Sequence, residues 1–131
     1  MYDDFCILLV DDFSTMRRVI RRMLRDRGIE NVIEAENGKQ AWKLLNDQKI
    51  DLVICDWNMP NMKGVDLLEL VRSHSRMSAL PFVMVTAEGK KNFIEQAIEK
   101  GATGYVTKPF SSEELFSVLG NILPGEAKQR K

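Results

Sequence analysis

The sequence predicts an α/β fold in which one doubly wound sheet of five parallel strands is covered by five helices. Short apolar runs alternate along the chain with longer segments whose apolar residues recur every three or four positions. This alternation is typical of parallel βαβ units with right-handed crossovers. The apolar runs at 5–10 and 52–56 are continuous, as expected for strands that are covered on both faces. A carboxylate stands at the carboxyl end of each of these two runs.

Composition and charge narrow the class of protein. The 131 residues are 44% hydrophobic and 29% charged, which is ordinary for a globular domain. Nineteen basic residues balance nineteen acidic ones, so no net field attracts nucleic acid or an anionic membrane. The start at 1–4 lacks the segments of a secretory signal, no apolar run is long enough to cross a membrane, and no glycine-rich nucleotide loop occurs. We expect a cytoplasmic monomer that binds neither nucleic acid nor membrane.

The first half of the chain supplies two strands and two helices. The apolar run at 5–10 is the first strand, and the residues at 14–27 form a helix with Met16, Val19, Ile20, Met23 and Leu24 on its inner face. Arginines fill the rest of that helix. They are either a binding patch or a solvated face, and general experience favours the solvated face. A weaker strand at 31–36 alternates in polarity, so we expect it near the sheet edge, and a helix follows the Asn37-Gly38 turn signal to about Asn46.

The second half repeats the alternation three times. The predicted strands are 52–56, 81–86 and 104–107, and the predicted helices are 64–73, 90–100 and a last one that runs from a Ser111–Glu114 capping box to Ile122. The helix at 90–100 directs Phe93, Ile94, Ala97 and Ile98 inward. We expect a single domain over 1–124 and a polar, basic, disordered tail at 125–131.

Three residues with reactive side chains are given no catalytic role. Cys6 and Cys55 lie inside predicted strands and match no zinc-binding spacing, so we expect buried, reduced thiols. Because strand side chains alternate in direction, Cys55 should point away from its neighbour Asp56. His74, the only histidine, is expected at a solvated helix end.

Five polar residues fall at the carboxyl ends of four predicted strands: Asp11, Asp12, Asp56, Thr86 and Lys108. Open α/β sheets bind their ligands in the crevice at this edge. Singly, each residue has a simpler explanation, since the first two aspartates could cap a helix, the threonine could end its strand and the lysine could be a solvated charge. Their convergence on one edge favours a common site. An X-Pro bond can be cis at small cost, so Lys108-Pro109 could turn the lysine back toward that site.

The chemistry of this set suits phosphoryl transfer. Three crowded carboxylates repel one another, so one would hold a proton unless a hard cation such as Mg²⁺ were bound. Asp56 could then attack phosphorus in line and form an acyl phosphate. The ammonium of Lys108 and the hydroxyl of Thr86 would neutralise the equatorial oxygens, which is the main task of a protein in such a transfer.

The residues at these strand ends resemble the receiver domain of two-component response regulators. The resemblance is carried by Val10-Asp11-Asp12, the strand into Asp56, the stretch 58–64 (Asn-Met-Pro-Asn-Met-Lys-Gly), Thr86-Ala87 and Lys108-Pro109-Phe110. The stretches 12–18, 55–60, 86–88 and 104–106 are most similar to chemotaxis regulators of the CheY type. One departure is Gly89, which stands where we would expect a small helix former, so the start of the following helix would be loosened.

The resemblance implies a flavodoxin-like, CheY-like fold and a set of residue roles. Asp56 would be the phosphorylation site, and the directly bound ligands of Mg²⁺ would be Asp12, Asp56 and the backbone carbonyl of Asn58. Asp11 would act through a metal-bound water, and Lys108 would contact the phosphoryl group. The switch would pair Thr86 with Tyr105, whose rotation would alter the surface of the fourth helix, last strand and fifth helix. Asn58 and Glu88 would lie where the family tunes dephosphorylation.

The resemblance also implies the function and its partners. The protein would accept a phosphoryl group from a CheA-like histidine kinase and then bind a target, for which we prefer the flagellar motor switch protein, with a phosphatase as a further partner. It would not be an enzyme beyond its own phosphorylation and dephosphorylation. The absence of a second domain favours protein binding over DNA binding as its output. Two alternatives stay open at this point, a phosphorelay shuttle that passes phosphate to a histidine phosphotransfer protein, and a metal-dependent aspartyl-phosphate phosphatase.

Overall fold

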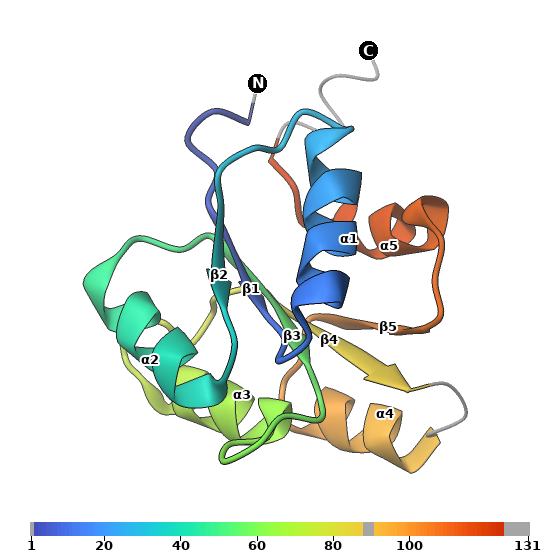
Figure 1. Cartoon of the computed structure of the whole chain (residues 1–131). Coiled ribbons are helices and arrows are strands. Elements are labelled where there is room, and N and C mark those ends of the chain that lie inside the picture. The colour runs from blue at the N-terminus through green and yellow to red at the C-terminus, as the bar shows by residue number, and fades with distance from the viewer. Residues whose placement is uncertain (1, 88–90, 125–131) are drawn as a thin grey trace.

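The computed structural model describes residues 2–87 and 91–124, which form one five-stranded parallel sheet flanked by five helices (Figure 1). The strands are β1 (Ile7–Val10), β2 (Val32–Ala35), β3 (Leu52–Asp56), β4 (Phe82–Ala87) and β5 (Gly104–Lys108). The helices are α1 (Ser14–Arg25), α2 (Gly38–Asp47), α3 (Gly64–Ser73), α4 (Lys91–Glu99) and α5 (Ser112–Leu119). The predicted fold class is confirmed.

The strands lie in the order β2-β1-β3-β4-β5, and every neighbouring pair is parallel. The strand expected near the edge, β2, is indeed an edge strand. The chain leaves β1 in one direction to form β2 and then crosses to the other side of β1 to form β3. The carboxyl ends of β1 and β3 therefore border the point where the winding direction reverses, and such a point opens a crevice.

Two apolar layers hold the helices on the sheet. Residues from α2, α3 and α4 pack on one face around Val53, Leu67 and Phe82. Residues from α1 and α5 pack on the other face around Leu9, Leu24 and Leu115. Figure 1 shows α1 and α5 together on the face opposite α2, α3 and α4. The sheet is thus covered on both sides, which is why its strands are continuous apolar runs.

Two apolar residues predicted to face inward lie in solvent instead. Val19 of α1 and Ile98 of α4 are exposed, whereas their chain neighbours Ile20 and Ala97 are buried. Consecutive residues of a helix are turned about 100° from each other. A residue next to a buried one therefore falls outside a narrow contact stripe, and both predictions were wrong for this reason.

Several predicted boundaries shift by a few residues. The helix expected to reach 27 ends at Arg25, because the chain turns through Gly28, whose φ of +87° suits glycine. The last helix ends at Leu119 and not at Ile122, although the Ser111–Glu114 capping box is present as predicted. The expected disordered tail at 125–131 and the loosened helix start at Gly89 lie outside the described residues.

The expectations for the cysteines and the histidine hold in part. Both cysteines are free and buried, and burial raises the pKa of each thiol, but Cys6 precedes β1 and does not lie within it. Cys55 packs in the apolar layer on the side of α2 and α3, away from the carboxylates. His74 caps the end of α3 but packs edge-on against the Trp42 ring at 5.8 Å between centroids, so it is only partly solvated.

The arginines of α1 are mostly a solvated face. Arg18, Arg22 and Arg25 are exposed and form no ion pair with the residues placed in the structure, while Arg17 and Arg21 both pair with Glu34. None of the helices in the described ranges is long and apolar enough to cross a membrane.

Candidate functional site

Three carboxylates meet at the crevice where the sheet reverses its winding. Asp56 is the last residue of β3, and Asp11 and Asp12 directly follow β1, which pairs with β3 along its length. One carboxylate oxygen from each residue lies within 4.8 Å of the other two. The structure therefore brings together the three acids that the sequence predicted at this edge.

Burial and mutual repulsion raise the pKa of two of these acids. Asp56 is only 5% exposed, and its desolvation, followed by the negative charge of Asp11, raises its pKa to about 6. Lys108 opposes this rise through its charge and its hydrogen bond. The pKa of Asp11 is raised mainly by desolvation, although its carboxylate accepts a hydrogen bond from the backbone N–H of Phe13 at 2.8 Å. Both shifts have the direction expected if crowding favours a proton on one of the carboxylates, although desolvation is their larger cause.

The Lys108 ammonium is the cationic group of the site. Its Nζ donates to Oδ1 of Asp56 at 3.3 Å and lies 3.7 Å from Oδ2 of Asp11. The sequence predicted Lys108 just beyond the last strand, but it is the last residue of β5. The Lys108-Pro109 peptide bond is cis, the conformation that the sequence analysis considered.

A second cation, which the sequence analysis missed, supports β1 at the crevice. Nη1 of Arg17 donates to the backbone carbonyl of Asp11, and Nε of the same residue donates to Glu34. The guanidinium thus bridges the end of β1 to β2. Sequence alone gave no signal for this role, because Arg17 is one of six arginines between residues 17 and 27.

The Thr86 hydroxyl is buried beside the carboxylates without a hydrogen-bond partner among the residues that the structure places. Its residue is 2% exposed and lines the same cavity as Asp56 and Lys108. An unpaired buried hydroxyl costs about 1–3 kcal/mol. The group is therefore available to donate to an oxygen that enters the cavity.

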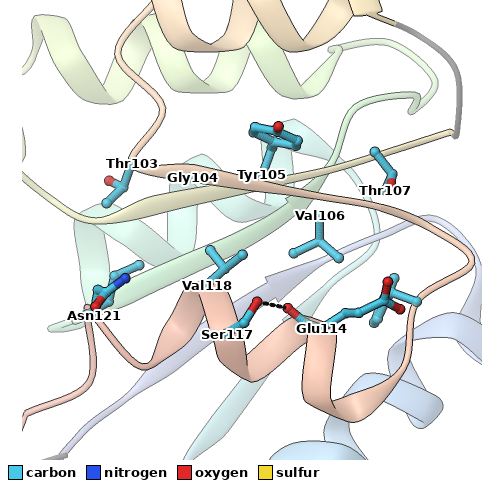
Figure 2. A pocket seen from close by; sticks show the side chains of 11 residues that line it. Thr103, Gly104, Tyr105, Val106, Thr107, Glu114, Ser117, Val118 and Asn121 are labelled. Atoms are coloured by element: carbon cyan, nitrogen blue, oxygen red, sulfur yellow. Dashed lines mark hydrogen bonds between the residues drawn. The ribbon is translucent and has the colours of Figure 1, made fainter. Parts of the chain in front are cut away.

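Tyr105 lies on the strand beside Thr86 but does not lie in the cavity. It is opposite Met84 in the β4–β5 register, two positions before Thr86, and it is 39% exposed. Figure 2 shows its ring on the side of β5 that faces away from Val106 and α5. The two predicted switch residues are thus on adjacent strands, with the threonine buried and the tyrosine outside.

A tight loop after β3 presents Asn58 to the site. The backbone N–H of Asn58 donates to the Asp56 carboxylate, and Trp57 is held at both ends, by its N–H to Val85 and by its carbonyl to the N–H of Gly64, both at 2.9 Å. A Cβ at Gly64 would lie 2.4 Å from the carbonyl oxygen of Asp56, so only glycine permits this closure. Gly64 ends the stretch 58–64, but the reason for a glycine there depends on the approach of this backbone to Asp56.

The polar groups surround a cavity of about 350 Å³. Those that line it are Asp12, Asp56, Asn58, Thr86 and Lys108. The donor set fits Mg²⁺, because it offers carboxylate and carbonyl oxygens and no sulfur or imidazole, and the acids stand within 4.8 Å of one another. A cation there would also relieve the repulsion that raises the pKa of Asp56. The arrangement can hold a divalent cation beside a buried carboxylate and an ammonium.

Comparison with known proteins identifies the family. The model of the response regulator receiver domain matches residues 7–120. The chain is 50% identical to the chemotaxis protein CheY of Pseudomonas aeruginosa over 116 residues, which is 88% of this chain and 94% of that protein. It is 45% identical to CheY-3 of Vibrio cholerae over 116 residues, or 88% of this chain and 89% of that one.

A solved structure agrees with these relatives. The chemotaxis protein CheY4 of Vibrio cholerae superposes with a TM-score of 0.83 at 33% identity, and the match covers 91% of this chain and 98% of that chain. Its sheet and helices therefore correspond to those described above. The chain belongs to the response regulator receiver family and is a receiver of the CheY type.

Proposed function

We propose that Asp56 accepts a phosphoryl group and that the resulting acyl phosphate switches the surface of the protein. The family is one of phosphoryl acceptors. The observation that carries the assignment to Asp56 is its position, buried at the end of β3, with the ammonium of Lys108 at 3.3 Å and two further carboxylates within 4.8 Å. Asp11 is also buried and lies 3.7 Å from Lys108, but of these two acids only Asp56 accepts a hydrogen bond from Lys108 and lines the cavity.

The transfer step follows from these positions. A carboxylate oxygen of Asp56 forms a bond to phosphorus while the phosphorus–nitrogen bond of a phosphohistidine breaks, and the imidazole leaves with a proton. The Lys108 ammonium balances charge on one phosphoryl oxygen, and the Thr86 hydroxyl donates to another. Mg²⁺ held directly by Asp12, Asp56 and the Asn58 carbonyl, and by Asp11 through water, would supply further positive charge to the phosphoryl oxygens.

The switch uses the two residues on β4 and β5. The unpaired hydroxyl of Thr86 gains a hydrogen bond by moving toward the phosphoryl oxygen, which frees space beside β5 for the ring of Tyr105. This movement changes the surface of α4, β5 and α5, where a groove of about 510 Å³ lies between β5 and α5 (Figure 2). Val106, Phe110 and Val118 line this groove, so it offers an apolar contact to a target. A local change of charge at Asp56 thereby alters a surface away from the phosphorylation site.

The partners follow from the family and the relatives. We assign a CheA-like histidine kinase as the donor, the flagellar motor switch protein as the target, and a phosphatase as a further partner. The chemotaxis names of the relatives support this output. The same reasoning retains the expected cytoplasmic location, the monomeric state and the receiver domain over 1–124. Beyond its own phosphorylation and dephosphorylation, the protein is assigned no enzymatic activity.

Radiolabelled acetyl phosphate with Mg²⁺ tests the acceptor. We expect label on the wild type and none on Asp56→Asn, while Asp47→Asn, an exposed carboxylate on α2, labels normally. Labelling of Asp56→Asn to the same extent as the wild type would contradict the proposal. Sustained release of phosphate from an external ester, dependent on Asp56, would instead favour the phosphatase.

The output is tested by a pull-down in which the immobilised protein is incubated with a lysate of motile cells, with and without beryllofluoride and Mg²⁺. A flagellar switch component retained only in the activated sample supports motor control. Retention of a histidine phosphotransfer protein in its place would favour the phosphorelay shuttle. Asp56→Asn serves as the control that beryllofluoride cannot activate.

A further inference from the structure

The acceptor cavity has an aromatic wall that the proposed chemistry does not use. Besides its polar residues, the cavity is lined by Phe13, Trp57 and Phe93. Phe93 belongs to α4, whereas Trp57 lies in the loop that follows β3. The two rings stack with their centroids 4.9 Å apart and their planes inclined by 10°. Trp57 is only 4% exposed and Phe93 is partly buried, so the stack shields the Trp57 ring from solvent.

The stack has a fixed side and a weakly held side. The backbone of Trp57 is fixed by hydrogen bonds to Val85 and Gly64, so its ring is a rigid surface. The helix α4, by contrast, has Ala97 as the only fully buried residue among those the structure describes in it. Contact with Trp57 therefore helps to place the first turns of α4.

The opposite rim of the cavity is open. Phe13, which lies between Asp12 and the start of α1, is 65% exposed, so its ring does not close that side. The Phe93 ring closes the side of α4, and it has no hydrogen-bonding group that could place a water molecule. A water molecule occupies about 30 Å³ in the liquid, so a cavity of about 350 Å³ has room for about ten waters, or for a phosphoryl group with fewer of them.

We propose that Phe93 is a positioning residue for the phosphoryl chemistry of Asp56: by stacking on Trp57 it closes the α4 side of the acceptor cavity and so restricts both the size of the phosphodonor and the access of water to the acyl phosphate. The inference rests on the proposed function, because it needs Asp56 as the acceptor. Hydrolysis breaks the phosphorus–oxygen bond when water attacks phosphorus in line, and the product is inorganic phosphate with the Asp56 carboxylate restored. Fewer waters near the phosphorus make this attack slower.

The test compares two acyl phosphate donors that differ in size. Acetyl phosphate and benzoyl phosphate transfer the same group, so the ratio of their phosphorylation rates reports space around Asp56. For Phe93→Ala we expect the benzoyl to acetyl ratio to rise about tenfold, near the lower end of the discrimination that one apolar contact provides. The half-life of the acyl phosphate should fall by a similar factor. Phe93→Tyr, which keeps the ring, should restore both values to those of the wild type.

Two controls separate this role from a general loosening of α4. Ile98→Ala removes an exposed apolar side chain from the same helix and should change neither the ratio nor the half-life. In a Trp42→Phe background, the emission of Trp57 alone reports whether the stack is lost. If Phe93→Ala does not fold, Phe93→Leu, which is apolar but lacks the ring, replaces it. We expect its donor ratio and acyl phosphate half-life to lie between those of the wild type and those predicted for Phe93→Ala.

The outcomes distinguish this inference from the proposed function. A wild type that accepts phosphate from neither donor contradicts the acceptor assignment itself. A wild type that is phosphorylated normally, together with a Phe93→Ala variant whose Trp57 emission shifts while the donor ratio and half-life stay unchanged, overturns the inference alone.

Discussion

The ammonium of Lys108 and the carboxylate of Asp56 are joined by a 3.3 Å hydrogen bond, although a whole strand, β4, lies between the strands that carry them. Both residues end their strands at the same edge of the sheet, and the long side chain of the lysine crosses the gap. Lys108 also lies 3.7 Å from Asp11. One cation thus balances two buried carboxylates, and the first prediction tests this balance.

Replacing Lys108 by methionine removes that cation while keeping most of the side-chain volume. Because Lys108 lowers the pKa of Asp56, we expect the pKa of Asp56 to rise further above about 6 in the variant, as followed by NMR of the carboxyl carbon. Phosphorylation by acetyl phosphate should slow by about tenfold, the loss of one charge-assisted hydrogen bond. Lys63→Met, at an exposed lysine, should leave both values as in the wild type. An unchanged pKa in Lys108→Met would contradict the balance described here.

The buried charge of Asp56 makes the stability of the protein depend on pH. Its pKa is about 6 in the folded state against an ordinary value of 3.8, so between these values the unfolded chain loses a proton that the folded protein keeps. The free energy of unfolding therefore falls as pH rises from about 4 to about 7. Two pKa units correspond to about 3 kcal/mol, which is an upper estimate for one group.

Asp56→Asn removes this dependence, since the amide never becomes charged. With a chelator present to remove metal, urea titrations at pH 7 should give the variant a free energy of unfolding up to about 3 kcal/mol higher than that of the wild type. The difference should disappear below about pH 4, where the carboxyl group is protonated in both states. A difference of constant size across this range would mean that the charge of Asp56 is not its source.

The three carboxylates should act together in metal binding. Asp12→Asn removes one charge from the cluster, and we expect the affinity for Mg²⁺ to fall at least about tenfold, which is a loss of 1.4 kcal/mol or more. The emission of Trp57 in a Trp42→Phe background reports the titration. Asp47→Asn is the matched control, because Asp47 is exposed on α2 and does not belong to the carboxylate cluster. Equal affinity in Asp12→Asn and Asp47→Asn would exclude Asp12 as a ligand.

Gly64 should be essential for closure of the loop that carries Asn58. A methyl group at this position would lie 2.4 Å from the carbonyl oxygen of Asp56, so the start of α3 must move away. We expect Gly64→Ala to lower the free energy of unfolding by about 2–4 kcal/mol in urea titrations. Gly120→Ala is the comparison, because Gly120 has an ordinary helical φ of −59° and should tolerate alanine. Similar stability of the two variants would refute the steric argument.

Thr86→Val should separate stability from switching. Valine has nearly the same shape but lacks the buried hydroxyl that has no partner within the described residues, so the unphosphorylated variant should gain about 1 kcal/mol of stability. Beryllofluoride binding should persist, whereas the accompanying change in the environment of Tyr105, seen by NMR, should be lost. A normal response of Tyr105 in Thr86→Val would contradict the coupling of these two residues.

Much of the fold and the core of the site could be predicted from the sequence because the strands are so plainly marked. Continuous apolar runs that alternate with helical segments are typical of parallel strands, and parallel strands place their carboxyl ends at one edge. Asp56 and Lys108 could therefore be assigned to one site although 52 positions separate them. The resemblance to receiver domains added residues whose roles the pattern could not supply, such as Tyr105.

The remaining features depend on directions that a periodic pattern does not fix. Val19 and Ile98 are apolar and adjacent to buried residues, but a turn of about 100° places them in solvent. The stack of Trp57 on Phe93 depends on how α4 lies across β4, and the contact of Arg17 with Asp11 depends on which of several arginines faces the strand end. Each is decided by tertiary packing.

Identifying the phosphorylated residue tests the central claim most directly. Acyl phosphates are reduced by borohydride to alcohols, so a phosphorylated aspartate becomes homoserine, which peptide mass spectrometry can locate. After treatment with acetyl phosphate and Mg²⁺, we predict homoserine at position 56 alone, and none after treatment of Asp56→Asn. Homoserine at Asp11 or Asp12 of the wild type, or no homoserine in a protein that carries phosphate, would contradict the assignment of Asp56 as the acceptor.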